Sequence, residues 1–117
     1  MITKEAIEKA HDKIKPYIHH TPVLTNSSIN EMAEAELFFK CENFQKIGAF
    51  KIRGGMYAAL SLSPVQIRKG LATHSSGNHA QAIAFAAKTL GTKAFIVMPE
   101  NSPAVKVNAV KGYGAEV

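Results

Sequence analysis

The sequence contains no tryptophan and a single cysteine, Cys41, so it forms no internal disulfide and no cysteine-based zinc cluster. No apolar run reaches the roughly 18 residues that a membrane-spanning helix needs, and residues 1–16 carry charges throughout. We find no signal or transit peptide, no internal repeat and no low-complexity segment. These absences predict a cytoplasmic protein without a membrane partner.

The chain also lacks a basic block, although its net charge is +5. Its lysines are scattered among acidic residues without interleaved aromatic residues, which argues against a nucleic-acid interface. A solvated surface explains the charge better, and a basic chain would also suit an anionic small ligand. With 46% apolar and 20% charged residues, the composition is that of an ordinary folded domain.

Hydrophobic spacing and turn residues predict the elements of the first half of the chain. They are a helix behind Thr3 that closes near Pro16, an extended segment 19–25, a short helix with a Ser28–Glu31 capping box, a strand 36–42, a loop 43–50 and a helix 51–63. Gly54 and Gly55 lie inside the last helix, where each costs about 1 kcal/mol relative to alanine. Either something packs very close to that turn, or the helix is irregular there.

The second half has a regular rhythm of strands and helices. We expect a strand 71–76, a helix 79–90 stopped by Gly91, a strand 93–99 that is buried, a helix 102–114 capped by Ser102, and the start of a strand at 115–117. This β-α-β-α-β order predicts an α/β fold with a parallel sheet and right-handed crossovers. Because so small a sheet has too few neighbours to cover both faces, and the chain stops as a strand begins, we expect a fragment of a longer protein. A boundary is expected near residues 64–70.

The stretch SSGNHA, residues 75–80, lies between a predicted strand and a predicted helix. The free N–H groups of a helix start then point into the crevice at the carboxyl end of the strand, a geometry that binds anions. Simple capping by Ser76 or Asn78 is an equally good interpretation of the spacing. A hydrolase is disfavoured because no G-x-S-x-G elbow is present, and the histidines lack the spacing of a metal site.

Lys51 lies in GAFKIRGG, between Phe50 and Ile52 at the predicted start of a helix. Partial desolvation and the positive helix end would both favour the neutral amine, which is the nucleophile needed for a Schiff base. From these residues alone, a lysine that points to water is the more frequent arrangement.

Four stretches together resemble one family: TPVLTNSS, LFFKCENFQKIGAFKIRGG, THSSGNHAQA and AFIVMPENSP. They resemble the serine racemase and serine–threonine dehydratase family, fold-type-II pyridoxal-phosphate enzymes related in fold to the tryptophan synthase β-subunit. The resemblance covers essentially the whole chain. It implies a three-layer parallel-sheet fold, incomplete in this chain, with residues 1–68 as part of the large cofactor domain and residues 69–117 as the start of the small substrate domain.

The resemblance also implies roles for single residues. Lys51 forms the Schiff base with pyridoxal 5'-phosphate and carries a proton at the substrate Cα, while Phe50 packs against the cofactor ring. Asn78 hydrogen-bonds the 3'-oxygen of the cofactor. The substrate carboxylate is held by the loop that contains Ser75, Ser76, Gly77, Asn78 and His79.

Ser76 is the most informative single position. Threonine dehydratases of the family often read SAGNH, whereas serine racemases and 3-hydroxyaspartate dehydratases read SSGNH, as this chain does. In the racemases, this serine is the acid and base on the cofactor face opposite the lysine. Inversion at Cα needs two proton carriers, whereas β-elimination needs one.

The resemblance therefore implies a pyridoxal-phosphate-dependent serine/threonine dehydratase, a serine racemase, or both, acting on small β-hydroxy amino acids. A truncated, non-catalytic homologue and a dehydratase specific for threonine or 3-hydroxyaspartate remain alternatives. The phosphate-binding loop, the residue facing the pyridine nitrogen and a Mg or Mn site are expected beyond Val117. A homodimer is also implied, with ATP as an effector bound between subunits through the region of Ser27 and Lys46.

Overall fold

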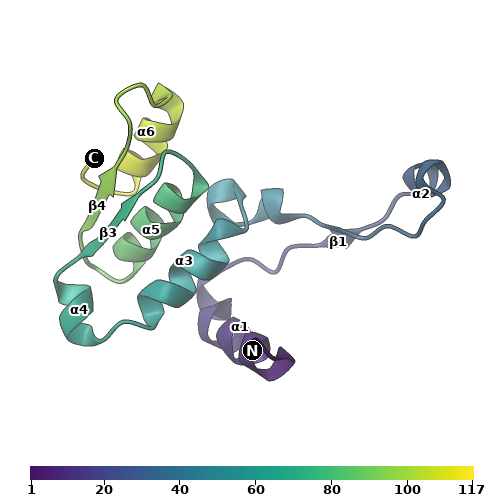
Figure 1. Ribbon diagram of the computed structural model, residues 1–117, viewed down its shortest axis with the longest axis horizontal. Coiled ribbons are helices and arrows are strands. Elements are labelled where there is room, and N and C mark those ends of the chain that lie inside the picture. Colours follow the sequence, from purple (N-terminus) through teal and green to yellow (C-terminus); the bar gives the residue numbers. More distant parts are fainter.

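The computed structural model describes all residues 1–117 and divides into an α/β body and a long arm (Figure 1). The helices are α1 Lys4–Ile14, α2 Ser27–Ala33, α3 Lys51–Leu60, α4 Pro64–Arg68, α5 Asn78–Thr89 and α6 Ala104–Gly112. The strands are β1 Val23–Leu24, β2 Phe39–Lys40, β3 Leu71–His74 and β4 Ala94–Val97. Short 3-10 helices occupy Lys15–Tyr17, Glu42–Phe44 and Lys46–Gly48.

The arm is an antiparallel pair of β1 and β2 that carries α2 at its far tip (Figure 1). Each strand pairs only two residues, so the extended segments predicted at 19–25 and 36–42 are mostly unpaired chain. The predicted capping box of Ser28 and Glu31 is wrong, because α2 begins at Ser27 and Asn26 caps it. The side-chain oxygen of Asn26 accepts a hydrogen bond from the Ile29 N–H at 3.0 Å.

The sheet of the body confirms the predicted β-α-β-α-β order. Strands β3 and β4 are parallel and α5 connects them; residue Glu116 then adds a parallel bridge beside Phe95. Leu71, Ala94 and Ile96 are buried on the side of the sheet that α5 covers. On the other face Val97 is 70% exposed, so strand 93–99 is buried on one side only. The reason is that the helices of the chain form a layer on one face of the sheet alone.

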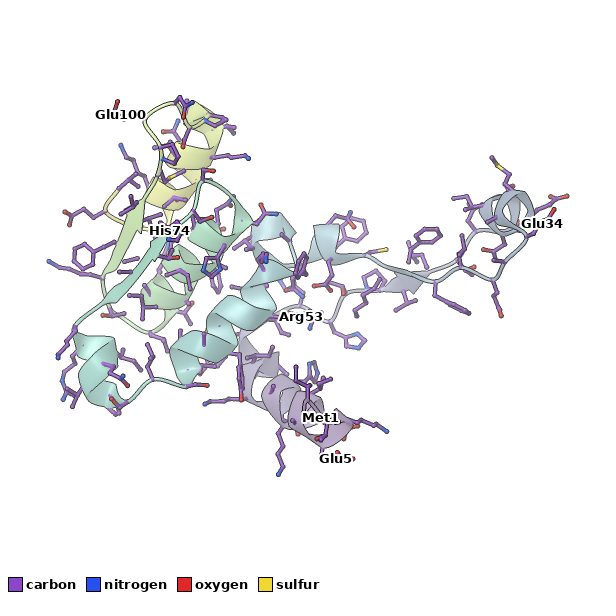
Figure 2. All side chains as sticks on the ribbon, viewed as in Figure 1. Met1, Glu5, Glu34, Arg53, His74 and Glu100 are labelled. Carbon is purple, nitrogen blue, oxygen red and sulfur yellow. The ribbon has the colours of Figure 1, made fainter.

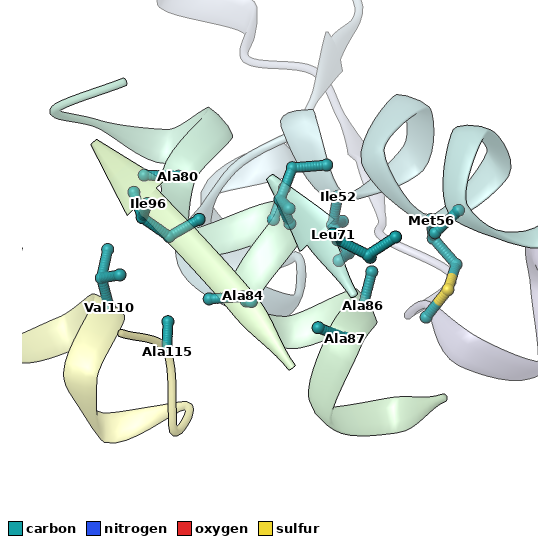
Figure 3. Packing of buried hydrophobic residues seen from close by; sticks show 14 of the residues in the cluster. Ile52, Met56, Leu71, Ala80, Ala84, Ala86, Ala87, Ile96, Val110 and Ala115 are labelled. Carbon is teal, nitrogen blue, oxygen red and sulfur yellow. The ribbon is translucent and has the colours of Figure 1, made fainter. Parts of the chain in front are cut away.

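Close packing of α3 on α5 forms the centre of the core, to which α5 contributes mainly alanines and α3 contributes Ile52 and Met56 (Figure 3). A Cβ at Gly55 would lie 2.9 Å from the Cβ of Ala82, nearer than real Cβ atoms approach one another. Gly55 therefore has a close neighbour, which was one of the two explanations that the sequence left open. A Cβ at Gly54 would meet nothing within 4 Å.

Two helix starts differ from the prediction. Helix α4 was not predicted; Ser63 caps it and forms a capping box with Gln66. The predicted cap of α6 by Ser102 is wrong, because Pro103 takes the N-cap position and Ser102 lies one residue too early. The Ser102 hydroxyl is buried without a hydrogen-bond partner. No helix of the chain combines the length and the apolar character needed to cross a membrane.

Candidate functional site

Lys51 is the first residue of α3, and Phe50 before it caps the helix without a side-chain hydrogen bond. The Lys51 side chain is exposed, and its Nζ lies 5.1 Å from the centroid of the Phe50 ring. The expected place at a helix start is confirmed. The expected desolvation is not found, because Phe50 is itself 59% exposed and covers one side of the amine only.

A hollow separates the first turn of α3 from the start of α5. It is lined by Phe50, Lys51, Arg53, Gly54, Gly55 and His79. The structure thus brings Lys51 together with one residue of the SSGNHA stretch, His79, which lies 28 residues further along the chain. Of the six, Arg53 was not predicted from the sequence.

A second hollow lies at the carboxyl ends of β3 and β4. It is lined by His74, Ser75, Ser76, Val97, Met98 and Pro99. Figure 2 shows His74 at this end of the sheet. Ser75 and Ser76 therefore lie at the sheet edge as predicted, but in a different hollow from that of Lys51. Gly77 and Asn78 line neither hollow.

The start of α5 has no side-chain cap. Gly77 is the N-cap residue, so the predicted capping by Ser76 or Asn78 is not found. Ser75 Oγ accepts one hydrogen bond, from the Gly77 N–H at 3.3 Å. The N–H groups of the first turn have no partners within the helix, and they are the part of a helix that binds anions.

Next to the first hollow, Arg53 and Glu42 form a two-point ion pair. The Arg53 side chain donates to both carboxylate oxygens of Glu42 at 2.8 Å, and the Thr21 hydroxyl donates to one of them. The hydrogen bonds from Arg53 are the main cause that lowers the pKa of Glu42 to about 2. The same contact raises the pKa of Arg53. No sequence pattern indicated this pair, because its partners stand eleven positions apart in a region without a shared period.

The structure is thus an α/β protein in which a lysine at one helix start shares a hollow with the uncapped start of a second helix, a geometry that suits an anion. Residues 14–117 match the family described as "Pyridoxal-phosphate dependent enzyme". The chain belongs to this family of pyridoxal-phosphate-dependent enzymes, whose cofactor is pyridoxal phosphate.

Curated relatives include racemases and ammonia-lyases. The chain is 54% identical over 116 residues to the serine racemase of Dictyostelium discoideum, which is 99% of this chain and 36% of the relative. It is 53% identical over 108 residues to the L-threo-3-hydroxyaspartate ammonia-lyase of Saccharomyces cerevisiae, which is 92% of this chain and 33% of the relative. The chain thus spans about a third of the length of the curated relatives that it matches.

Solved structures of such relatives have the same fold. The crystal structure of the Dictyostelium discoideum serine racemase superposes with a TM-score of 0.94 at 54% identity, over 99% of this chain and 38% of that chain. The structure of maize serine racemase superposes with a TM-score of 0.92 at 53% identity, over 96% of this chain and 34% of that chain. The predicted fold class, that of the fold-type-II pyridoxal-phosphate enzymes, is confirmed, and this chain covers part of it.

Proposed function

We propose that this chain carries the lysine and the substrate loop of a pyridoxal-phosphate-dependent enzyme that racemises serine, releases ammonia from small β-hydroxy amino acids, or does both. One observation supports this most: Lys51 and His79, from two separate motifs, line one hollow between α3 and the uncapped start of α5. The identity of 54% to a serine racemase gives the hollow its chemical interpretation.

The residues at this hollow fit a flat, anionic group with an aldehyde. Lys51 offers a primary amine for the aldehyde, and the exposed Phe50 ring offers a flat apolar face. Gly54 leaves open space, since a Cβ there would meet no atom within 4 Å. The unpaired N–H groups at the start of α5 suit an anion.

Lys51 and Ser76 are the proposed proton carriers. When bound, pyridoxal phosphate supplies an electron sink for the bond that breaks at the substrate Cα. The Lys51 amine holds the cofactor and moves the proton on one face of Cα. The Ser76 hydroxyl moves it on the opposite face, which inversion requires and elimination does not.

The remaining predicted residues bind and orient. Ser75, Ser76, Gly77, Asn78 and His79 hold the substrate carboxylate with the start of α5, where N–H groups and the helix dipole favour a negative charge. Asn78 would also help to hold the cofactor, as the family resemblance implies. Phe50 would flank the cofactor ring and limit its movement.

Cofactor attachment to Lys51 tests the proposal. The purified whole protein, which extends this chain to the length of its relatives, is incubated with pyridoxal phosphate, reduced with borohydride, and digested for peptide mass spectrometry. We expect the cofactor on Lys51, and we expect Lys51→Ala to lose both this peptide and the visible absorbance of the bound cofactor. Lys88→Ala, in the exposed last turn of α5, is the matched control and should leave both unchanged.

No attachment to Lys51 in the unsubstituted protein would refute the proposal. That result would favour the alternative of a non-catalytic homologue.

A dehydratase for 3-hydroxyaspartate or threonine without racemase activity is the second candidate. It is favoured by the 53% identity to an L-threo-3-hydroxyaspartate ammonia-lyase and by 47% identity to a β-hydroxyaspartate dehydratase of Paracoccus denitrificans. Chiral analysis of products from serine, threonine and 3-hydroxyaspartate separates the two candidates. D-serine or keto acid formed from serine supports the first, and keto acid formed from threonine or 3-hydroxyaspartate but not from serine, without D-serine, supports the second.

Finer features are proposals carried by the family resemblance. Residues 1–68 would belong to the large cofactor domain and residues 69–117 to the small substrate domain. The whole protein would be a cytoplasmic homodimer, with a Mg or Mn ion held by residues outside this chain. ATP would bind near Ser27 and Lys46 as an effector.

A further inference from the structure

The turn that carries Lys51 lacks the usual internal support of a helix start. Phe50 provides no side-chain cap for α3, and the first two turns contain Gly54 and Gly55. Glycine weakens a helix because the unfolded chain has more backbone freedom to lose. Contacts from outside the helix must therefore hold this turn, and through it Lys51, in place.

The segment just before Lys51 is strained. Ile47 has a φ of 62° and Gly48 a φ of 67°. For a β-branched residue such as Ile47 this conformation is an outlier, and it persists only where the surroundings enforce it. Upstream, the buried Gln45 is tied to His19 by two hydrogen bonds, of 2.8 and 2.7 Å.

The strained residues lie within segment 42–53. Glu42 and Arg53 are its two end residues, and their side chains contact each other. Their two hydrogen bonds fix distance and orientation together, because a guanidinium and a carboxylate meet as two flat forks. The Arg53 and Glu42 side chains are only 27% and 18% exposed. Figure 2 shows Arg53 where the arm joins the body.

The Glu42 carboxylate is itself held from the arm side. The hydroxyl of the buried Thr21 donates to it, and the Lys40 Nζ donates to the Thr21 carbonyl oxygen at 2.7 Å. Half-buried ion pairs of this kind are weak evidence for stability as such, since desolvation offsets their attraction. Such pairs are better known for fixing the relative positions of the residues that they join. Here the pair fixes the turn that contains Lys51.

We propose that Glu42 and Arg53 are positioning residues: their two-point contact closes the strained segment 42–53 and directs Lys51 toward the hollow that it shares with His79. This inference rests on the proposed function, because it assigns the pair a role in cofactor capture by Lys51. Neither residue needs to touch the cofactor for this role.

The test measures where pyridoxal phosphate attaches. Each variant is incubated with pyridoxal phosphate, reduced with borohydride and analysed by peptide mass spectrometry for the fraction on Lys51 relative to the other lysines. Glu42→Gln removes the charge and one acceptor, while Arg53→Lys keeps the charge and removes the fork. We expect both to lower the fraction on Lys51 on the order of 10-fold, since small misplacements of a reacting group have such effects.

Asp12→Asn is the matched control. It breaks the ion pair of Asp12 with Lys15, which is exposed and lies outside the hollow, and it should leave the Lys51 fraction unchanged. Thermal unfolding of each variant fixes a temperature at which all are folded. If Glu42→Gln does not fold, Arg53→Lys decides the matter.

Several results would overturn the inference. One is an unchanged Lys51 fraction in Arg53→Lys, and another is a loss that merely follows the unfolded fraction. If the unsubstituted protein attaches no cofactor at Lys51, the proposed function fails and the role of the pair falls with it. Attachment in the unsubstituted protein with no change in the variants refutes the pair alone.

Discussion

At the scale of a single residue, Ser76 is the position that we propose separates racemase from dehydratase activity. Its side chain lines the hollow at the carboxyl ends of β3 and β4, whereas Lys51 lines the hollow beside His79. Two proton carriers that come from different elements suit proton transfer at opposite faces of the substrate Cα. In the proposed function, Lys51 moves the proton on one face of the substrate Cα and Ser76 moves it on the other.

Replacing Ser76 with alanine should therefore separate the two activities. We expect racemisation of serine to fall by about 10²–10⁴-fold, the usual contribution of a general acid or base, while ammonia release is partly retained. Chiral chromatography of serine and a keto acid assay measure the two rates. Ser76→Thr keeps a hydroxyl and should recover part of the racemisation; an equal loss of both activities in Ser76→Ala would contradict the two-carrier arrangement.

The lowered pKa of the Glu42 carboxyl makes the free energy of unfolding depend on pH. Its pKa is lowered from the ordinary 4.5 to about 2 in the folded protein, mainly by hydrogen bonds from Arg53. The stabilisation is therefore fully present above pH 4.5 and is lost as the pH falls through about 2.

We expect the free energy of unfolding to fall between pH 4.5 and pH 2, with Glu42 accounting for about 1–3 kcal/mol of the loss. Denaturant unfolding at each pH measures it, and the difference between the unsubstituted protein and Glu42→Gln isolates Glu42. This subtraction matters because the pKa of Asp12 is also lowered, by its hydrogen bond to Lys15. Parallel pH profiles for the two proteins would show that Glu42 is not the cause.

At the scale of elements, the contact of α3 with α5 determines how close Lys51 comes to the SSGNHA loop. Gly55 and Ala82 let the two helix backbones approach, and Ile52 and Met56 fill the core beside them (Figure 3). Any added volume at this contact pushes apart the two helix starts that form the hollow.

Gly54 and Gly55 provide a matched pair for this contact. Gly55→Ala should destabilise the protein by about 1–3 kcal/mol, because its Cβ would lie 2.9 Å from that of Ala82. Gly54→Ala should stabilise it by about 0.5–1 kcal/mol, since its Cβ meets nothing and alanine favours the helix. Denaturant unfolding compares the two; a gain in stability from Gly55→Ala would contradict the close packing.

At the scale of the whole molecule, the chain is far less compact than its length allows. Its radius of gyration is 16.7 Å, against about 13 Å for a compact domain of this size. The arm accounts for this, because it extends away from the body (Figure 1), and its apolar side chains are largely exposed. Met32 on the arm is 86% exposed, whereas Met56 in the body is fully buried.

The same substitution at these two methionines should change stability by very different amounts. Met56→Ala should destabilise the protein by about 2–5 kcal/mol through the lost apolar burial and the cavity that it leaves. Met32→Ala should change the free energy of unfolding by no more than about 0.5 kcal/mol. Similar losses from both variants would show that the arm packs against something in solution.

Much of the body was predictable because its elements depend on neighbours in the sequence. The short strand before the SSGNHA turn, the alanine run of α5, the stop at Gly91 and the apolar run of β4 predicted the β-α-β-α-β order and the parallel sheet. The four stretches that resemble the family, which include the motifs around Lys51 and Ser76, likewise indicated the family correctly.

Contacts between distant residues were decided only by the tertiary structure. The pair of Glu42 and Arg53 has no periodic signature in the sequence. The cap of α2 is Asn26 and not Ser28, because the backbone of Asn26 is extended just before the helix begins. The exposure of Lys51 and the separation of Ser76 from it into another hollow depend on how α3 packs on α5. Local spacing determines elements because backbone propensity acts within a few residues, whereas the site forms where Gly55 lets two helices approach.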